Sequence, residues 1–81
     1  MPVRSAALPE WVIDRRRALG QRIAAARREA GVSQEALAHH IGVERRSIQR
    51  YEAGVRDPGY SDLLLIAHVL GVPLTDLVGT E

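Results

Sequence analysis

Apolar residues in the first third of the chain recur at the spacing of one face of an α-helix. This stripe consists of Val12, Leu19, Ile23, Ala26 and Ala30. Its members are three, four or seven residues apart, whereas most arginines of the segment fall outside it. The glycine that follows, Gly31, is the usual residue for a left-handed helix end. The pattern therefore predicts a long amphipathic helix that ends at Gly31.

Glycine and proline divide the rest of the chain into four shorter apolar segments. Ser33 is a good N-cap for the first of them. The expected helices cover about residues 34–41, about 44–53, the segment between the turn at 57–59 and Gly71, and residues 73–78. No strand alternation and no internal repeat is visible. The sequence predicts an all-α fold, a compact five-helix bundle.

Length and composition fit one small domain. The chain has 81 residues, 46% of them hydrophobic, with only three aromatic residues, so its core must be aliphatic. We expect a flexible N-terminal extension over residues 1–10 and a single domain over residues 11–81. The chain has no cysteine, no visible signal peptide and no apolar run of roughly 18 residues. These features predict a cytoplasmic protein with no membrane contact.

Charge is divided unevenly along the chain. The net charge is only +1, and all eleven basic residues are arginines. Residues 1–56 hold these eleven bases and six acids, a balance of +5, whereas residues 57–81 hold four acids and no base, a balance of −4. The basic part thus contains the segments expected to form the first three helices.

The stretch from 34 to 51 meets the steric demands of a helix-turn-helix. Counted from Gln34, Ala38 is fifth, Gly42 ninth, Val43 tenth, Ile48 fifteenth and Tyr51 eighteenth. The fifth position lies where two helices cross and needs a small side chain, and the ninth needs a positive φ, which glycine adopts without strain. The other three positions pack the second helix of the motif onto the first. Five constraints met in one window make this a specific signal.

The outer face of the second helix of this motif carries the candidate chemistry. With Ile48 and Tyr51 buried, helical periodicity turns Arg45, Arg46, Gln49 and Arg50 away from the core. Arginine can donate two hydrogen bonds to guanine and glutamine can pair with adenine, and each such contact discriminates by about 1–3 kcal/mol. A charged helix face can also be merely solvated. Its place in a helix-turn-helix favours base contacts in the major groove of double-stranded DNA.

Further residues complete a family pattern. They are Gly20 to Ile23, Arg27, Gly31 to Gln34, Leu37-Ala38, Gly42-Val43, Ile48, Glu52, Gly54, Pro58 and residues 67–74. Over about residues 19–78 this pattern resembles the XRE-type helix-turn-helix family, which includes the lambda-type phage repressors and Cro. The resemblance implies a bundle of five helices that binds operator DNA, usually as a homodimer on paired half-sites, with the third helix as the reader.

The resemblance also implies roles for single residues. Gln34 would touch the DNA backbone, Arg45 and Arg46 would contact bases, and Arg50 would contact bases or phosphate. The DNA-binding set that we expect is Gln34, Arg45, Arg46, Ser47, Gln49, Arg50 and Arg56, of which Arg56 is either a phosphate contact or merely exposed. Arg27 and Glu52 match a family pair that forms a buried salt bridge between the first and third helices, so their expected role is structural.

One departure from the family pattern lies in the fourth helix. Leu65 and Val69 occupy positions that normally face solvent. Exposed apolar pairs of this kind are often without function. Together with Leu64 and the segment 72–78, however, they would suit a two-fold dimer contact, and restriction-modification controller proteins of similar size pair through this region.

The sequence shows no catalytic arrangement. His39 and His40 are adjacent and cannot form the i, i+4 pair of metal-dependent hydrolases, and no glycine-rich phosphate loop is present. We expect a transcriptional regulator that is not an enzyme, needs no metal or cofactor and offers no evident place for a small-molecule effector. The alternative is a protein-interaction module, such as an antitoxin or adaptor, that holds a partner through Trp11 and the Leu65/Val69 surface. If no partner binds there, we expect Trp11 to anchor the start of the first helix.

Overall fold

Five α-helices make up the part of the chain that the structure, a computed structural model, describes, which is residues 7–79. They are α1 (Glu10–Glu29), α2 (Gln34–Ile41), α3 (Arg45–Glu52), α4 (Tyr60–Leu70) and α5 (Leu74–Val78). Residues 1–6 of the expected extension lie outside the described residues, and Glu10 already belongs to α1. The all-α, five-helix prediction is confirmed. No helix within residues 7–79 is long and apolar enough to cross a membrane.

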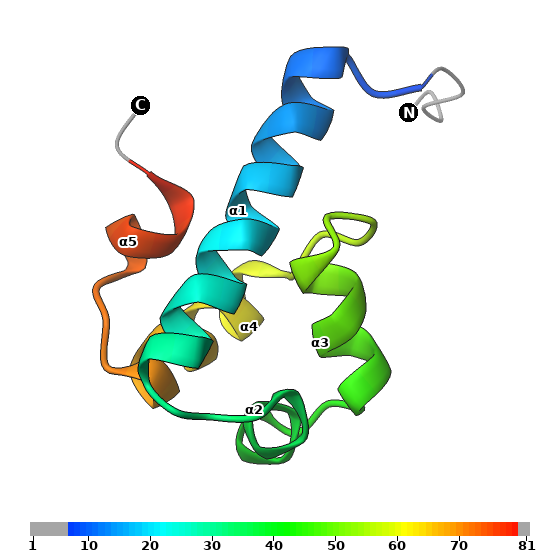
Figure 1. The fold of residues 1–81 in the computed structure, drawn as a ribbon. Coiled ribbons are helices and arrows are strands. Elements are labelled where there is room, and N and C mark those ends of the chain that lie inside the picture. Colours follow the sequence, from blue (N-terminus) through cyan, green and yellow to red (C-terminus); the bar gives the residue numbers. More distant parts are fainter. Residues whose placement is uncertain (1–6, 80–81) are drawn as a thin grey trace.

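The core is aliphatic apart from Tyr51 and draws on every helix. Its largest fully buried side chains are Ile23, Leu37, Ile48, Ile66 and Leu77, one from each helix in chain order. Figure 1 shows α1 running through the molecule with α5 on one side and α3 on the other. Helix α1 packs on α3, α4 and α5, while α2 packs on α3 and α4. The helix-turn-helix is thus held from behind by α1 and α4.

The inward face of α1 differs from the predicted stripe. Its buried residues are Gly20, Ile23, Ala24 and Arg27, whereas Val12 is half-buried and Ala30 is exposed. A pattern of apolar residues does not reveal a glycine or an arginine that faces the core. Gly20 is buried because the backbones of α1 and α3 nearly touch there: a Cβ atom on Gly20 would lie 2.4 Å from the carbonyl oxygen of Tyr51.

The first turns of α1 project beyond the bundle (Figure 1). Trp11 lies in this projecting part, and 62% of its surface is exposed. The guanidinium carbon of Arg15 lies 5.6 Å from the centre of the Trp11 ring. The prediction that Trp11 anchors the helix is therefore wrong, because this end of α1 extends past the elements that could cover the indole.

Candidate nucleic-acid interface

The turn between α2 and α3 has the geometry expected from the sequence. The Ser33 hydroxyl accepts a hydrogen bond from the backbone N–H of Ala36 at 3.0 Å, which caps the start of α2. Gly42 has φ 78° and ends α2 in the left-handed conformation. The Val43 N–H then donates to the carbonyl oxygen of Ala38 at 3.0 Å. These contacts redirect the chain so that α3 crosses α2.

Helix α3 is fixed to the bundle by its inner side chains. Ile48 is fully buried and Tyr51 is 5% exposed. The Tyr51 hydroxyl donates a 2.8 Å hydrogen bond to the Asp62 carboxylate of α4. Burial raises the pKa of Tyr51, the hydrogen bond and charge of Asp62 raise it further, and the charge of Arg56 acts in the opposite direction. The hydroxyl therefore stays protonated and ties α3 to α4.

A charged network joins α1 to the end of α3 and the start of α2. The Nε and Nη2 atoms of Arg27 donate to the two carboxylate oxygens of Glu52 at 2.6 and 3.0 Å. Nη1 of Arg27 donates to the carbonyl oxygen of Val32 at 3.0 Å, and Nε2 of Gln34 donates to Glu52 at 3.0 Å. The side chains of Arg27 and Glu52 are only 11% and 7% exposed. The hydrogen bond to Glu52 raises the pKa of Arg27 against the opposing effect of burial, so the guanidinium remains charged.

Gln34 has a contact that the sequence did not reveal. It was expected to face the DNA backbone, and it is half-buried at the start of α2 with its amide held by Glu52. An amide nitrogen carries two N–H groups, and the bond to Glu52 uses one of them. The side chain is therefore held by the same carboxylate that neutralises Arg27.

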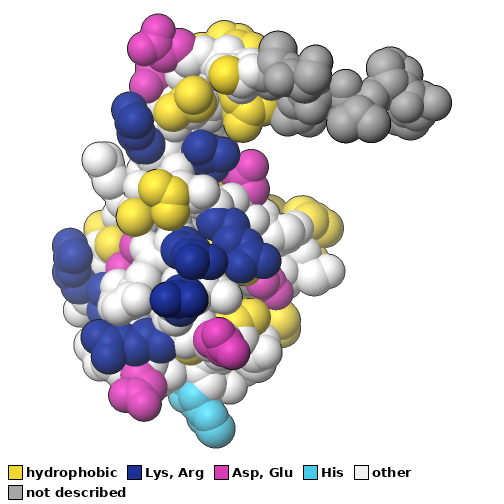
Figure 2. All heavy atoms as spheres, turned by 90° about the vertical axis from the view of Figure 1, so that its right-hand side faces the viewer, with side chains coloured by type: hydrophobic (Ala, Val, Ile, Leu, Met, Phe, Trp, Pro, Cys, Tyr) yellow, Lys and Arg dark blue, Asp and Glu magenta, His cyan; other side chains and the backbone are white. Residues whose placement is uncertain are grey.

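The outer face of α3 presents polar side chains to solvent. Arg45, Arg46, Gln49 and Arg50 are all exposed, and Ser47 is half-buried between them. Arg56 is exposed in the loop that follows α3. Figure 2 shows basic side chains gathered on the face of the molecule that carries α3. Six of the seven residues expected to bind DNA are thus on α3 or the loop behind it, and Gln34 lies at the start of the adjoining helix.

The apolar residues predicted to form a dimer contact lie on α4. Leu64 and Leu65 are each 43% exposed. Val69 is half-buried and packs against the core, so the expectation that it forms an exposed pair with Leu65 is only half right. The sequence gives no sign of this contact, because it depends on how α4 lies against the other helices.

Arg16 has a structural role that the sequence did not predict. Its Nε atom donates to the carbonyl oxygen of Gly54 at 2.8 Å, and its Nη1 atom lies 3.8 Å from the Asp57 carboxylate. In the sequence it is one of several arginines outside the apolar stripe, so no local signal separates it from its neighbours. Arg16 ties the loop after α3 to α1.

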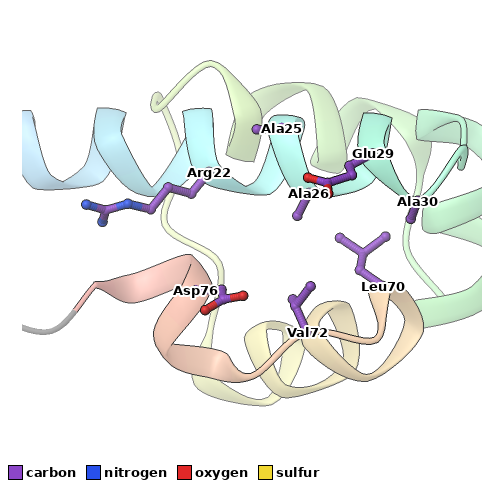
Figure 3. A pocket seen from close by; sticks show the side chains of 8 residues that line it. All are labelled: Arg22, Ala25, Ala26, Glu29, Ala30, Leu70, Val72 and Asp76. Carbon is purple, nitrogen blue, oxygen red and sulfur yellow. The ribbon is translucent and has the colours of Figure 1, made fainter.

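An open groove of about 530 Å³ lies on the other side of α1, between this helix and the end of α4 with α5 (Figure 3). Alanines of α1 and the side chains of Leu70 and Val72 line its apolar part. Arg22 extends away from that part (Figure 3), and Glu29 and Asp76 lie on opposite walls. The groove is separated from the outer face of α3 by α1 itself. Within residues 7–79, no group of three His, Cys, Asp or Glu side chains could hold a metal ion.

The similarity to known proteins agrees with this geometry. The Helix-turn-helix family model matches residues 23–77. Uncharacterized HTH-type transcriptional regulators of Sinorhizobium medicae (strain WSM419) and Rhizobium meliloti (strain 1021) are each 39% identical over 57 residues, which is 70% of this chain and 41% of the relative. The chain thus spans about two fifths of the length of these relatives.

Solved structures show the same arrangement of helices. The clp gene regulator ClgR from Corynebacterium glutamicum is similar with a TM-score of 0.76 and 26% identity, over 79% of this chain and 68% of that one. The restriction-modification controller protein C.AhdI from Aeromonas hydrophila is similar with a TM-score of 0.72 and 31% identity, over 79% of this chain and 96% of that one. Both matches agree with the helix-turn-helix read from residues 34–51.

Proposed function

Because this chain belongs to the XRE-type helix-turn-helix family, we propose that it is a sequence-specific DNA-binding transcriptional regulator that reads the major groove with α3. The observation that carries the proposal is the division of α3 into two faces. Ile48 and Tyr51 hold the inner face in the core, and the outer face bears three exposed arginines and Gln49. An α-helix of this kind fits the major groove, where arginine and glutamine can read base edges.

The proposed roles follow from position on the motif. Arg45 and Arg46, at the start of α3, contact bases, because the N-terminal residues of a recognition helix lie deepest in the groove. Ser47, Gln49 and Arg50 contact bases or the flanking phosphates. Gln34 uses its remaining amide N–H on the DNA backbone. The Arg27–Glu52 pair sets the position of α3 against α1 and does not contact DNA.

The test compares a selected duplex with a random one. Selection from random duplexes yields the preferred site, and fluorescence anisotropy then measures affinity for both duplexes at several salt concentrations. Each lost bidentate base contact is worth about 1–3 kcal/mol, or roughly 5- to 150-fold in affinity. Arg45→Ala/Arg46→Ala should therefore weaken binding to the selected duplex much more than binding to the random one.

Arg45→Lys/Arg46→Lys is the matched control. Lysine keeps the positive charge but lacks the planar fork of arginine, so binding to random DNA should persist while the preference for the selected duplex falls. Equal weakening of both duplexes by the alanine pair would count against base reading by these arginines.

A homodimer on paired half-sites is the proposed assembly. Leu64, Leu65 and the exposed part of Val69 provide an apolar patch on α4. Sedimentation of Leu65→Glu should show the mass of a monomer, because a two-fold contact would bring two copies of the new charge together. Val55→Glu is the control, since Val55 is an exposed valine of the loop between α3 and α4 and is not part of the α4 patch. A dimer mass that Leu65→Glu leaves unchanged would dismiss this interface.

The activity proposed is binding in the cytoplasm, without catalysis or cofactor, and it is supported by the names of the similar proteins, which are regulators. One observation favours a second function, that of holding a protein partner. Trp11 is 62% exposed on the projecting end of α1. If that surface holds a partner, wild-type protein should co-purify with it in a stoichiometric complex and Trp11→Ala should not. A wild-type protein that purifies alone, or a complex that survives Trp11→Ala, would refute this second function.

A further inference from the structure

The first half of α1 lies before residue 23, where the family match begins, yet it contacts the loop behind α3. Arg17, Gly20 and Arg27 are three and seven residues apart, which places them on the same side of α1, the side that faces α3 and the loop after it. Arg27 binds Glu52, and Gly20 lies against the backbone of Tyr51. Arg17 continues the same line of contact past the end of α3.

The side chain of Arg17 lies across Gly54. A Cβ atom built on Gly54 would lie 2.8 Å from Cα and 2.9 Å from Cγ of Arg17, and Gly54 itself is buried. Gly54 also has φ +73°, which favours glycine at this position. The absence of a side chain on Gly54 thus makes room for the stem of Arg17. Arginine commonly packs its stem on a protein surface while its charged head stays in water.

The guanidinium group of Arg17, unlike that of Arg16, is not held by an ion pair to another described residue. Arg16 is committed to the Gly54 carbonyl and to Asp57. Arg17 is exposed and has no ion-pair partner within residues 7–79, although Asp14 lies one turn earlier on the same helix. Arg56 follows Gly54 by two residues and is also exposed. Arg17 therefore adds an exposed guanidinium group from α1 beside Gly54, in the loop that also carries the exposed Arg56.

These contacts lead to an inference that rests on the proposed function and extends it. We infer that Arg17 binds a phosphate of the DNA strand that borders the major groove occupied by α3, next to the phosphate bound by Arg56. Helix α3 leads directly into the loop that holds Gly54, so a duplex seated on α3 presents a backbone to this loop. Duplex DNA carries one negative charge per about 1.7 Å of its axis. Guanidinium groups bind phosphate through two parallel hydrogen bonds.

Arg17→Met tests this inference because methionine keeps an unbranched stem over Gly54 and removes the charge. Arg17→Lys restores the charge. Arg22→Met is the matched control: it removes the same charge from the same helix, but Arg22 lies on the side of α1 that faces α5 (Figure 3). An unchanged thermal midpoint of unfolding shows that each variant is folded.

Fluorescence anisotropy on the selected and random duplexes gives the result. Each phosphate contact contributes about 0.9 to the slope of log K against log salt concentration. Arg17→Met should therefore lower that slope by about 0.9 per protomer and weaken both duplexes by the same factor. When salt rises fourfold, from 50 to 200 mM, wild type loses more affinity than Arg17→Met, because the variant has one phosphate contact fewer. The ratio of wild-type to Arg17→Met affinity should therefore shrink by about 3.5-fold per protomer. Arg17→Lys and Arg22→Met should keep the wild-type slope.

The possible failures are distinguishable. If wild-type protein prefers its selected duplex but Arg17→Met keeps the wild-type slope, Arg17 only covers Gly54, and this inference is overturned while the proposed function stands. If Arg17→Met weakens only the selected duplex, Arg17 contacts a base, and the phosphate assignment is overturned. If wild-type protein does not distinguish selected from random DNA, the proposed function and this inference both fall.

Discussion

Removing the Glu52 carboxylate should destabilise the protein far more than the loss of an ordinary ion pair. Glu52 accepts hydrogen bonds from two nitrogens of Arg27 and from Gln34, and its side chain is 7% exposed. Glu52→Met would leave the Arg27 guanidinium buried without a counter-charge. Because water cannot easily replace the lost carboxylate, the full cost of desolvating the guanidinium would appear in the free energy of unfolding.

The magnitude follows from the burial of both partners. Breaking a buried pair by removing one partner costs about 3–5 kcal/mol, whereas an exposed pair is worth about 0–1 kcal/mol. A domain of this size has roughly 0.05–0.15 kcal/mol of stability per residue, so Glu52→Met removes a large share of it. With about 4–8 °C per kcal/mol in a domain of this length, the midpoint of thermal unfolding should fall by more than about 12 °C.

Urea denaturation of four proteins is the assay: wild type, Arg27→Met, Glu52→Met and the double variant. Replacing both partners of a buried pair with apolar side chains is often neutral or stabilising. The double variant should therefore be more stable than Glu52→Met, although the Val32 carbonyl loses its donor. A loss below about 1 kcal/mol in Glu52→Met would refute the reasoning, because it is the value of an exposed pair. Strictly additive effects in the double variant would refute it too.

Two further predictions concern α1 and α3. Gly20→Ala should lower the denaturation midpoint, although alanine favours helices by about 1 kcal/mol over glycine, because its Cβ would lie 2.4 Å from the Tyr51 carbonyl oxygen; a midpoint equal to or above that of wild type would contradict this. The pKa of Tyr51 is raised above 10.0 in the folded state, so its contribution to stability is complete below pH 10 and is lost as pH rises through the folded-state value. Chemical denaturation should show stability falling above pH 10 in wild type and less steeply in Tyr51→Phe, and identical pH profiles would contradict this assignment.

Local signals were sufficient to predict the order and ends of the helices. The helix expected at 34–41 is α2, and the one expected at about 44–53 is α3 at 45–52. Glycine supplied these boundaries, since Gly31, Gly42 and Gly71 all adopt positive φ next to a helix end. The outer face of α3 was predictable for a related reason: once two inner positions are known, helical periodicity fixes the direction of the others.

Contacts between distant segments could not be predicted from the sequence in the same way. The Gln34–Glu52 hydrogen bond and the Arg16–Gly54 contact depend on how α1 crosses α3. That crossing is close because Gly20 has no side chain. A glycine inside a helix does not predict which segment will pack against it. Trp11 was misjudged for the converse reason, since an apolar residue predicts burial only where another element is present to cover it.

The two faces of α3 use separate sets of side chains, and this separation bears on how such a protein can change. Everything that locates the helix lies on its inner side or at its end, in Ile48, Tyr51 and Glu52. The outward positions 45, 46, 49 and 50 have no part in the core. New residues can therefore be introduced at these four positions with little penalty to folding. The same scaffold could bind a different DNA site after substitutions at these few positions, with its thermal stability unchanged.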